Sequence, residues 1–210
     1  MTIYALSSGT GTSGLAVIRI SGKMTSNIIK ILTDKELPEP RVATLRKINN
    51  INNSELIDEG IILWFPGPYS YTGEDMAEFH IHGSIAVIKA LHASISKIKN
   101  TRLAEPGEFT KLAFQNEKIN LLEAESIGDL ISSETEIQRK QAIQIMSGRS
   151  ANQFNQLREK LLKMLSNIEA KIDFPDEDLP TDVLKNIKKN SNQVINKIEN
   201  ILNDQKIGER

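Results

Sequence analysis

MAEFHIHGSIAVIKALHASISKI, residues 76–98, changes its hydrophobic period halfway along. In the first part, Ala77, Phe79 and Ile81 alternate with polar residues, which is the pattern of a strand with one buried face. After Ser84, which can cap a helix, apolar residues recur at helical spacing. The stretch therefore predicts a half-buried strand followed by an amphipathic helix.

The polar face of this strand carries Glu78, His80 and His82, and so two of the three histidines of the chain. Same-face positions lie about 6.6 Å apart, so two imidazoles could converge on a metal, although three ligands in a straight row splay rather than surround it. Histidines that bond across a sheet or at an interface fit the pattern too. A polar pocket for an organic ligand is the third interpretation, and the residues alone leave all three open.

Two further strands are predicted in the first half, at 15–20 (LAVIRI) and at 60–65 (GIILWF), where the second ends at a Pro-Gly-Pro sequence. A G-x-G-x-x-G pattern at residues 9–14 precedes a strand and not a helix, which favours a loop over a dinucleotide site. Arg19 interrupts its apolar strand. It requires an anion, either a protein carboxylate or a ligand.

The second half has helical periodicity throughout. Apolar positions from Lys118 predict a helix at 118–131, and Ser133 with Glu136 forms an S-x-x-E capping box for the next one. Further helices are predicted at 157–172 and 184–202, the first of them ending before Pro175.

The change from strand-type alternation to helical periodicity predicts an α+β chain with two domains. A mixed α/β domain spans 1–116 and an all-α helical domain spans 117–210. The run 173–178 (DFPDED) lacks the spacing of a calcium loop, so we expect a helix stop followed by a solvated acidic turn. The final DQKIGER is polar and ends abruptly, as a linker cut short would.

Charge and composition exclude several classes of protein. Twenty-six basic residues against 27 acidic ones give a net charge of -1, so there is no general attraction to nucleic acid or to anionic membranes, and any RNA contact must be local. There is no cysteine, which excludes disulfides and thiolate chemistry. We expect a cytoplasmic protein without membrane contact, because no signal peptide or long apolar run is visible.

Four stretches resemble the tRNA-modification GTPases of the MnmE/TrmE family. They are GLAVIRISG (14–22), DEGIILWFPGPYSYTGEDMAEFHIHG (58–83), RLAEPGEFTKLAFQNEKINLLEAESIGDLI (102–131) and IDFPDED (172–178). They follow the family's order over nearly the whole chain, and the SYTGED and PGEFT blocks are specific to it.

The resemblance implies an N-terminal folate-binding and dimerising domain, similar to that of tetrahydrofolate-dependent one-carbon enzymes. A helical domain follows, into which a GTPase domain using GTP, Mg²⁺ and K⁺ is inserted. Family members form homodimers and act with the flavoprotein MnmG (GidA) to add an aminomethyl-type group to C5 of the wobble uridine of tRNA. We expect this chain to end where the GTPase domain would begin, to hold no catalytic residue of its own, and to lack GTPase activity alone.

By motif, Arg19, Glu78 and Lys118 match the family's residues for a tetrahydrofolate derivative, formyl- or methylene-tetrahydrofolate. A pterin presents an exocyclic amine beside a ring N–H, a donor pair that a carboxylate such as Glu78 can accept. The two cations suit the ligand's carbonyl or glutamate-tail oxygens. His80 and His82 are expected to line the same pocket, and no metal site is expected.

The chain departs from the family pattern at four positions, which are Ser84 in place of glycine, Leu112 in place of arginine, Gln115 in place of leucine and Asn120 in place of aspartate. None of these removes the three expected folate contacts. Two alternatives remain open, a metal-dependent enzyme using Glu78, His80 and His82, and a dimerisation scaffold that binds no ligand.

Overall fold

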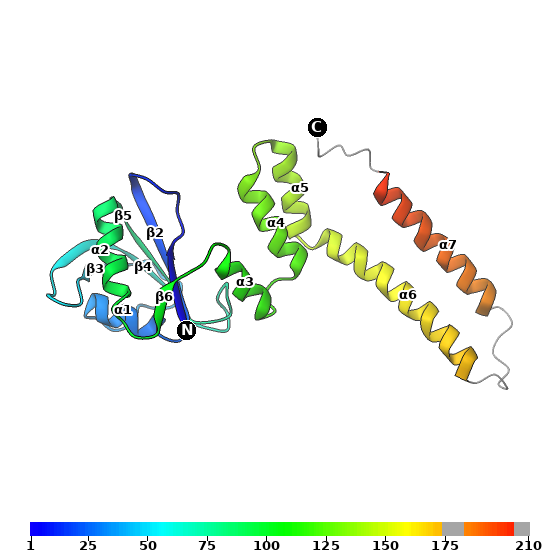
Figure 1. The fold of residues 1–210 in the computed structure, drawn as a ribbon, viewed down its shortest axis with the longest axis horizontal. Coiled ribbons are helices and arrows are strands. Elements are labelled where there is room, and N and C mark those ends of the chain that lie inside the picture. Colours follow the sequence, from blue (N-terminus) through cyan, green and yellow to red (C-terminus); the bar gives the residue numbers. More distant parts are fainter. Residues whose placement is uncertain (174–182, 204–210) are drawn as a thin grey trace. The chain divides into compact units, whose positions relative to one another are not determined.

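The computed structural model describes residues 1–173 and 183–203 (Figure 1). The chain divides into two compact units, Met1–Asn120 and Leu121–Arg210. The first is a mixed sheet with helices and the second is all helical, so the α+β fold class is confirmed. The units separate after Asn120, a few residues beyond the expected boundary at 116.

The N-terminal unit contains six strands and three helices. The strands are β1 (Thr2–Leu6), β2 (Ser13–Ser21), β3 (Thr44–Asn49), β4 (Leu56–Phe65), β5 (Met76–Gly83) and β6 (Thr101–Leu103), and the helices are α1 (Thr25–Thr33), α2 (Ile85–Ile95) and α3 (Glu108–Gln115). The sheet order is β3-β4-β5-β2-β1-β6. The β1/β6 pair is parallel and the other neighbours are antiparallel.

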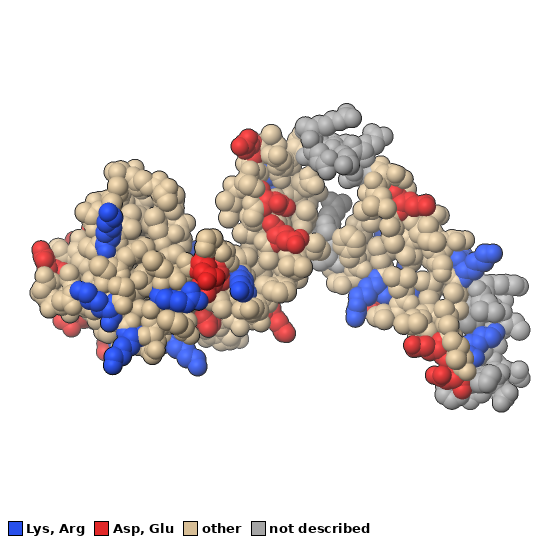
Figure 2. Space-filling view, in the orientation of Figure 1, with Lys and Arg blue, Asp and Glu red and all other residues tan. Residues whose placement is uncertain are grey.

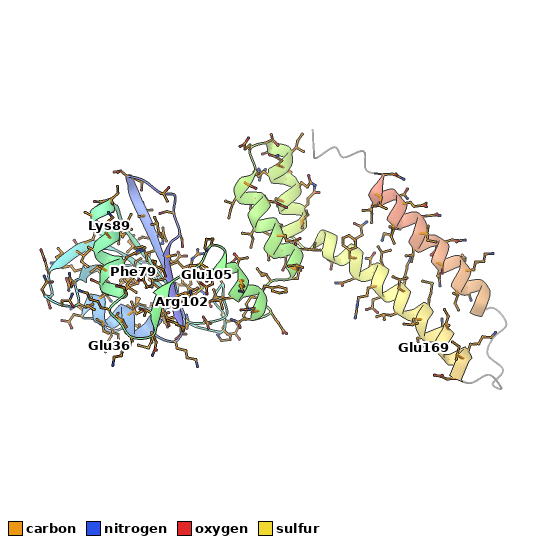
Figure 3. The ribbon with its side chains drawn as sticks, in the orientation of Figure 1. Glu36, Phe79, Lys89, Arg102, Glu105 and Glu169 are labelled. Carbon is orange, nitrogen blue, oxygen red and sulfur yellow. The ribbon has the colours of Figure 1, made fainter. Side chains whose placement is uncertain are left out.

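One face of the sheet forms the core with α1 and α2. Phe79 and Ile81 of β5 are buried in it, as their alternation predicted. Phe79 lies within the sheet among many packed side chains (Figure 3). Ile28 of α1 and Leu91 of α2 are fully buried against this face. Since successive strand residues point to opposite sides, Glu78 and its same-parity neighbours must lie on the second face.

Ser84 caps α2 as expected, because its side chain accepts a hydrogen bond from the amide of Ala86. The loop between β4 and β5, which contains the SYTGED sequence, is anchored to the end of β2. The hydroxyls of the buried residues Thr72 and Ser21 lie 2.7 Å apart, and Ser21 also donates to Glu74. This anchor holds the loop beside Arg19, which is two residues before Ser21.

The helical unit consists of α4 (Leu121–Ser132), α5 (Glu136–Met146), α6 (Arg149–Asp173) and α7 (Val183–Leu202). Helices α6 and α7 pack through a small core of Leu157, Met164 and Val194, with Ile201 against it. No helix in the part of the chain that the structure describes is long and apolar enough to span a membrane. The expected acidic turn at 174–178 lies outside the described residues.

Two predicted helix starts are wrong. Helix α4 begins at Leu121, and Lys118 lies in the turn before it, where its amide donates to Ala113 O at 2.8 Å. The capping box of α5 is Thr135 with Gln138, whereas Ser133 bonds back to Leu130 O. Both S-x-x-E and T-x-x-Q satisfy the same pattern here, and the helix begins after the second, because three residues connect Ser132 to Glu136 and the last of them, Thr135, is the cap.

Candidate functional site

Arg19 and Glu78 form an ion pair on the second face of the sheet. They are directly paired residues of β2 and β5. The guanidinium donates from Nε at 3.0 Å and from Nη2 at 2.8 Å, both to Oε1 of the carboxylate. The Arg19 side chain is 30% exposed and that of Glu78 is 17% exposed. The anion that Arg19 requires is therefore supplied by the protein itself.

The other oxygen of Glu78 faces His80. Nε2 of His80 lies 3.2 Å from Oε2, and the imidazole is about a quarter exposed. Burial raises the pKa of Glu78. The hydrogen bonds from Arg19 and His80 lower it by more than burial raises it, so the pKa lies below its usual range. Glu78 is therefore an ionised, partly dehydrated acceptor at neutral pH.

Two aromatic rings flank the Arg19 guanidinium. Its Cζ lies 5.7 Å from the centroid of the Tyr71 ring and 5.7 Å from that of the Phe109 ring. Tyr71 belongs to the SYTGED loop, and its hydroxyl lies 3.0 Å from the Thr110 hydroxyl of α3. The residue-by-residue sequence argument missed these three residues, although the SYTGED and PGEFT blocks that signalled the family contain them.

Lys118 also contacts this loop. A Cβ on Gly73 would lie 2.8 Å from Lys118 Cε, so the lysine side chain rests on this glycine. The adjacent Asn116 donates from Nδ2 to Thr72 O at 2.7 Å. The structure thus brings Arg19 and Glu78 into contact and places Lys118 on the loop that carries Tyr71.

His82 has a different partner from His80. Its Nδ1 and its backbone amide both lie 2.8 Å from the carboxylate of Asp58 on β4, and its side chain is 72% exposed. Burial raises the pKa of Asp58, but the hydrogen bonds from His82 and from the Glu59 amide together outweigh burial and bring that pKa below its usual range. His82 therefore joins β4 to β5 and makes no contact with Glu78.

The metal alternative gains no support from this geometry. Within residues 1–173 and 183–203, no group of three or more His, Asp or Glu residues could hold a metal ion. Glu78 bonds to Arg19 and His80, whereas His82 is engaged by Asp58. The three side chains do not converge on a common point.

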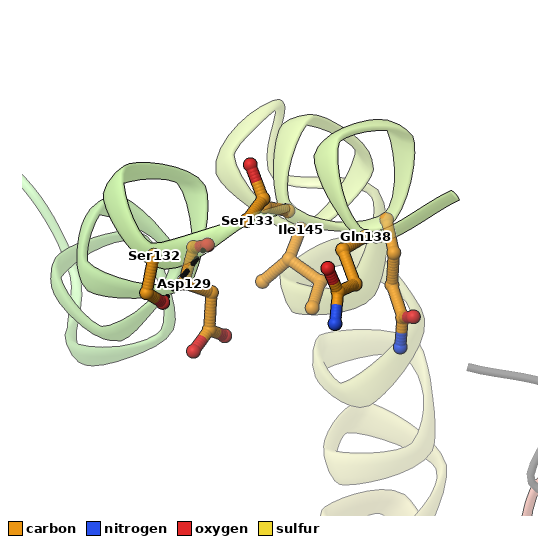
Figure 4. A pocket seen from close by; sticks show the side chains of 7 residues that line it. Asp129, Ser132, Ser133, Gln138 and Ile145 are labelled. Carbon is orange, nitrogen blue, oxygen red and sulfur yellow. Dashed lines mark hydrogen bonds between the residues drawn. The ribbon is translucent and has the colours of Figure 1, made fainter. Parts of the chain in front are cut away.

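A separate small cavity lies between α4 and α5, and none of the predicted site residues lines it (Figure 4). Its volume is about 190 Å³, and it is lined by Asp129, Ser132, Ser133, Gln138, Gln141, Ala142 and Ile145. The side-chain oxygen of Gln138 is committed to the amides of Glu134 and Thr135. Gln138 thus caps the start of α5, and Asp129 is the one charged residue among those that line the cavity.

Comparison with known proteins agrees with this division of the chain. The family described as GTP-binding protein TrmE N-terminus matches residues 2–118, and the MnmE helical domain matches residues 121–210. The chain belongs to the MnmE/TrmE family, as the sequence motifs indicated.

Individual relatives match along the full chain. It is 77% identical over 210 residues to the tRNA modification GTPase MnmE of Pelagibacter ubique (strain HTCC1062), covering 100% of this chain and 47% of the relative. It is 44% identical over 210 residues to the mitochondrial 5-taurinomethyluridine-[tRNA] synthase subunit GTPB3 of Danio rerio, covering 100% of this chain and 42% of that protein. The chain thus spans less than half the length of these relatives.

Proposed function

We propose that this chain is the folate-binding and dimer-forming part of a tRNA modification GTPase. The observation that carries the proposal is the Arg19–Glu78 pair, a half-buried carboxylate held ionised beside two aromatic rings. Lys118 lies against the neighbouring loop and adds a second cation. These are the three positions at which the family resemblance places the ligand.

The donor and acceptor chemistry fits a pterin. A carboxylate offers about four lone-pair positions, of which Arg19 uses two on Oε1 and His80 faces one on Oε2. One position on Oε2 thus remains for a ligand N–H. A contact with both donors of a pterin also requires Oε1, so Arg19 would give up one of its two bonds to Glu78.

The cations fit the remainder of a folate. Arg19 bonds to Glu78 through two of its five N–H groups, so others can reach a ligand carbonyl, and the exposed Lys118 suits a glutamate-tail carboxylate, which water also solvates. His80 supports the site by its contact with Glu78. The folate would supply the one-carbon unit, and these residues would bind and orient it.

Dimerisation through the N-terminal unit is supported by apolar exposure on the second face. Leu45 and Ile61 are directly paired on β3 and β4, and they are 62% and 39% exposed. Leu15 of β2 is 55% exposed. Exposed apolar side chains that lie side by side, as those of Leu45 and Ile61 do, are typical of interaction surfaces. We therefore propose a homodimer, which sedimentation at micromolar concentration would test by its mass.

The activity of the whole protein is a proposal that rests on the relatives' names and on the family resemblance. We propose that it modifies the wobble uridine of tRNA together with the flavoprotein MnmG, in the cytoplasm. On the visible face, basic side chains are dispersed among acidic and uncharged ones (Figure 2), so tRNA contacts would be local. The sequence contains no G-x-x-x-x-G-K-[ST] phosphate loop. We expect GTP, Mg²⁺ and K⁺ to bind outside this chain, which alone would not turn over GTP.

Isothermal titration of formyl-tetrahydrofolate into the 210-residue chain tests the folate proposal. Glu78→Ala is expected to abolish measurable binding, and His82→Ala, on the same strand face but paired with Asp58, is the matched control and should bind as the parent does. Absence of binding by the parent, with the dimer intact, would replace the proposal with the ligand-free scaffold.

A further inference from the structure

Resting on the proposed function, we infer that Tyr71 and Phe109 are ligand-contacting residues that hold the flat pterin ring of a reduced folate by stacking. No residue of the aromatic pair is among the three positions that the family motifs single out. The inference depends on where the rings lie and on what now occupies the space beside them.

The rings of Tyr71 and Phe109 lie against the Arg19 guanidinium and not against the hydrophobic core of the sheet. Both side chains are half-buried, and neither belongs to the buried cluster of the sheet or to the partly buried residues packed against it. Each ring centroid lies 5.7 Å from Arg19 Cζ. Their apolar surface is therefore directed at the ion pair of the candidate site.

The group that now meets these rings resembles the edge of a pterin. The 2-amino-4-oxo ring of a pterin contains a cyclic acylguanidine, flat and with adjacent N–H donors, as a guanidinium is. Arg19 presents its guanidinium to Glu78 while both rings flank it. A pterin that donates to Glu78 in place of one of these two guanidinium bonds would lie beside the same two rings.

The rings are also held in place before any ligand arrives. The Tyr71 hydroxyl is bonded to Thr110 at 3.0 Å. Phe109 lies in the first turn of α3, whose first residue, Glu108, is bound by both terminal nitrogens of Arg102. The amide of Glu105 donates to the same carboxylate at 2.8 Å, and Arg102 and Glu105 lie close together in Figure 3. Such preorganisation reduces the entropic cost of stacking a ligand.

The test compares the affinity of ring variants for formyl-tetrahydrofolate. Stacking of a flat base on an aromatic side chain contributes about 1–3 kcal/mol, so Phe109→Leu and Tyr71→Leu should each raise Kd by roughly 5- to 150-fold. Tyr71→Phe keeps the ring and should recover most of the affinity. Phe114→Leu, at a residue of the same helix that is 44% exposed, is the control and should stay within about twofold of the parent.

A second measurement is made on the parent protein, so it does not depend on how well a variant folds. In protein labelled with 4-fluorophenylalanine, the ¹⁹F resonance of Phe109, assigned from the spectrum of Phe109→Leu, should shift on titration of formyl-tetrahydrofolate, while that of Phe114 should not. The inference alone would be overturned if the parent protein binds the ligand without any shift of the Phe109 resonance and both Leu variants bind it as tightly as the parent does. A parent that binds no folate would overturn the proposed function and this inference together.

Discussion

Arg19 and Glu78, 59 residues apart in sequence, are opposite each other on β2 and β5, and two guanidinium nitrogens bond to one carboxylate oxygen. The pair stands at the junction of the SYTGED loop with the sheet, where Tyr71 and Phe109 cover the guanidinium. Its position makes it both a structural contact and the candidate anchor of the site. Stability and binding measurements can separate these two roles.

Glu78→Gln should lower the free energy of unfolding of the N-terminal unit by about 1–3 kcal/mol, because it leaves a partly buried guanidinium without its anion. Lys30→Gln is the control, since Lys30 pairs with Glu36 at the surface with side chains 44% and 86% exposed. It should cost less than about 1 kcal/mol.

Urea unfolding followed by Trp64 fluorescence measures both variants. Trp64 is 6% exposed and is the single tryptophan of the chain, so its signal reports on the N-terminal unit. Equal losses in the two variants would mean that the Arg19–Glu78 pair behaves as an ordinary surface ion pair.

The stability of the N-terminal unit should fall with acid in a manner that depends on Glu78. Burial raises its pKa, and the larger opposing effect of its hydrogen bonds leaves the pKa lower in the folded state than in the unfolded chain. The unfolded state therefore binds the proton first as the pH falls. The stabilisation is complete above the unfolded value of about 4.3 and is lost as the pH falls through the folded-state pKa.

Urea midpoints measured between about pH 3 and 7, across that titration, should fall less steeply for Glu78→Gln than for the parent chain. Asp58, whose pKa is lowered by His82 in spite of burial, contributes with the same sign, so part of the slope should remain. A variant profile parallel to that of the parent would show that Glu78 does not contribute to acid sensitivity.

The cap of α5 gives a prediction for the helical unit. Thr135→Ala removes the hydroxyl that accepts from the amide of Gln138, and it should cost about 1 kcal/mol. Ser133→Ala, at the position that the sequence pattern favoured, should cost less than about 0.5 kcal/mol. Far-UV circular dichroism during unfolding detects the loss, while the Trp64 transition should not move. A larger loss of stability in Ser133→Ala than in Thr135→Ala would mean that Ser133, and not Thr135, caps the helix.

The sequence predicted the fold best where a single periodicity persisted. The alternation of β5 is confirmed, because burial on one face imposes a fixed repeat. Helices α6 and α7 form where the apolar repeat predicted them, although Leu161, Leu165 and Ile172 of α6 are exposed. The short edge strand β6 and the eight-residue α3 have too few residues to show a period. Their positions depend on tertiary contacts such as the Arg102–Glu108 pair.

The candidate site could be predicted only in part for a similar reason. That Arg19 needs an anion follows from its apolar strand, but the choice of Glu78 depends on strand register. The placement of Phe109 over Arg19 requires α3 to return to the sheet, which no local pattern encodes. His82 shares the strand face of Glu78, yet the carboxylate of Asp58 on the neighbouring strand decides its orientation.

Gly73→Ala should weaken folate binding through Lys118. Gly73 has φ +80°, and the added methyl would lie 2.8 Å from Lys118 Cε, so the lysine side chain must shift from its place on the loop. Gly148→Ala is the strain-matched control, because Gly148 has φ +78° with no atom within 4 Å of a Cβ. Both variants should lose about 1–2 kcal/mol of stability from the left-handed backbone, but only Gly73→Ala should lose affinity.

Isothermal titration of the two glycine variants and of Lys118→Ala completes the comparison. If Gly73→Ala acts by displacing the lysine, then adding Lys118→Ala to it should cause little further loss, because the two changes remove the same contact. Full additivity would show that the variants act independently. Parental affinity in Gly73→Ala beside a loss in Lys118→Ala would mean that Lys118 binds the ligand from a position other than the one it occupies over Gly73.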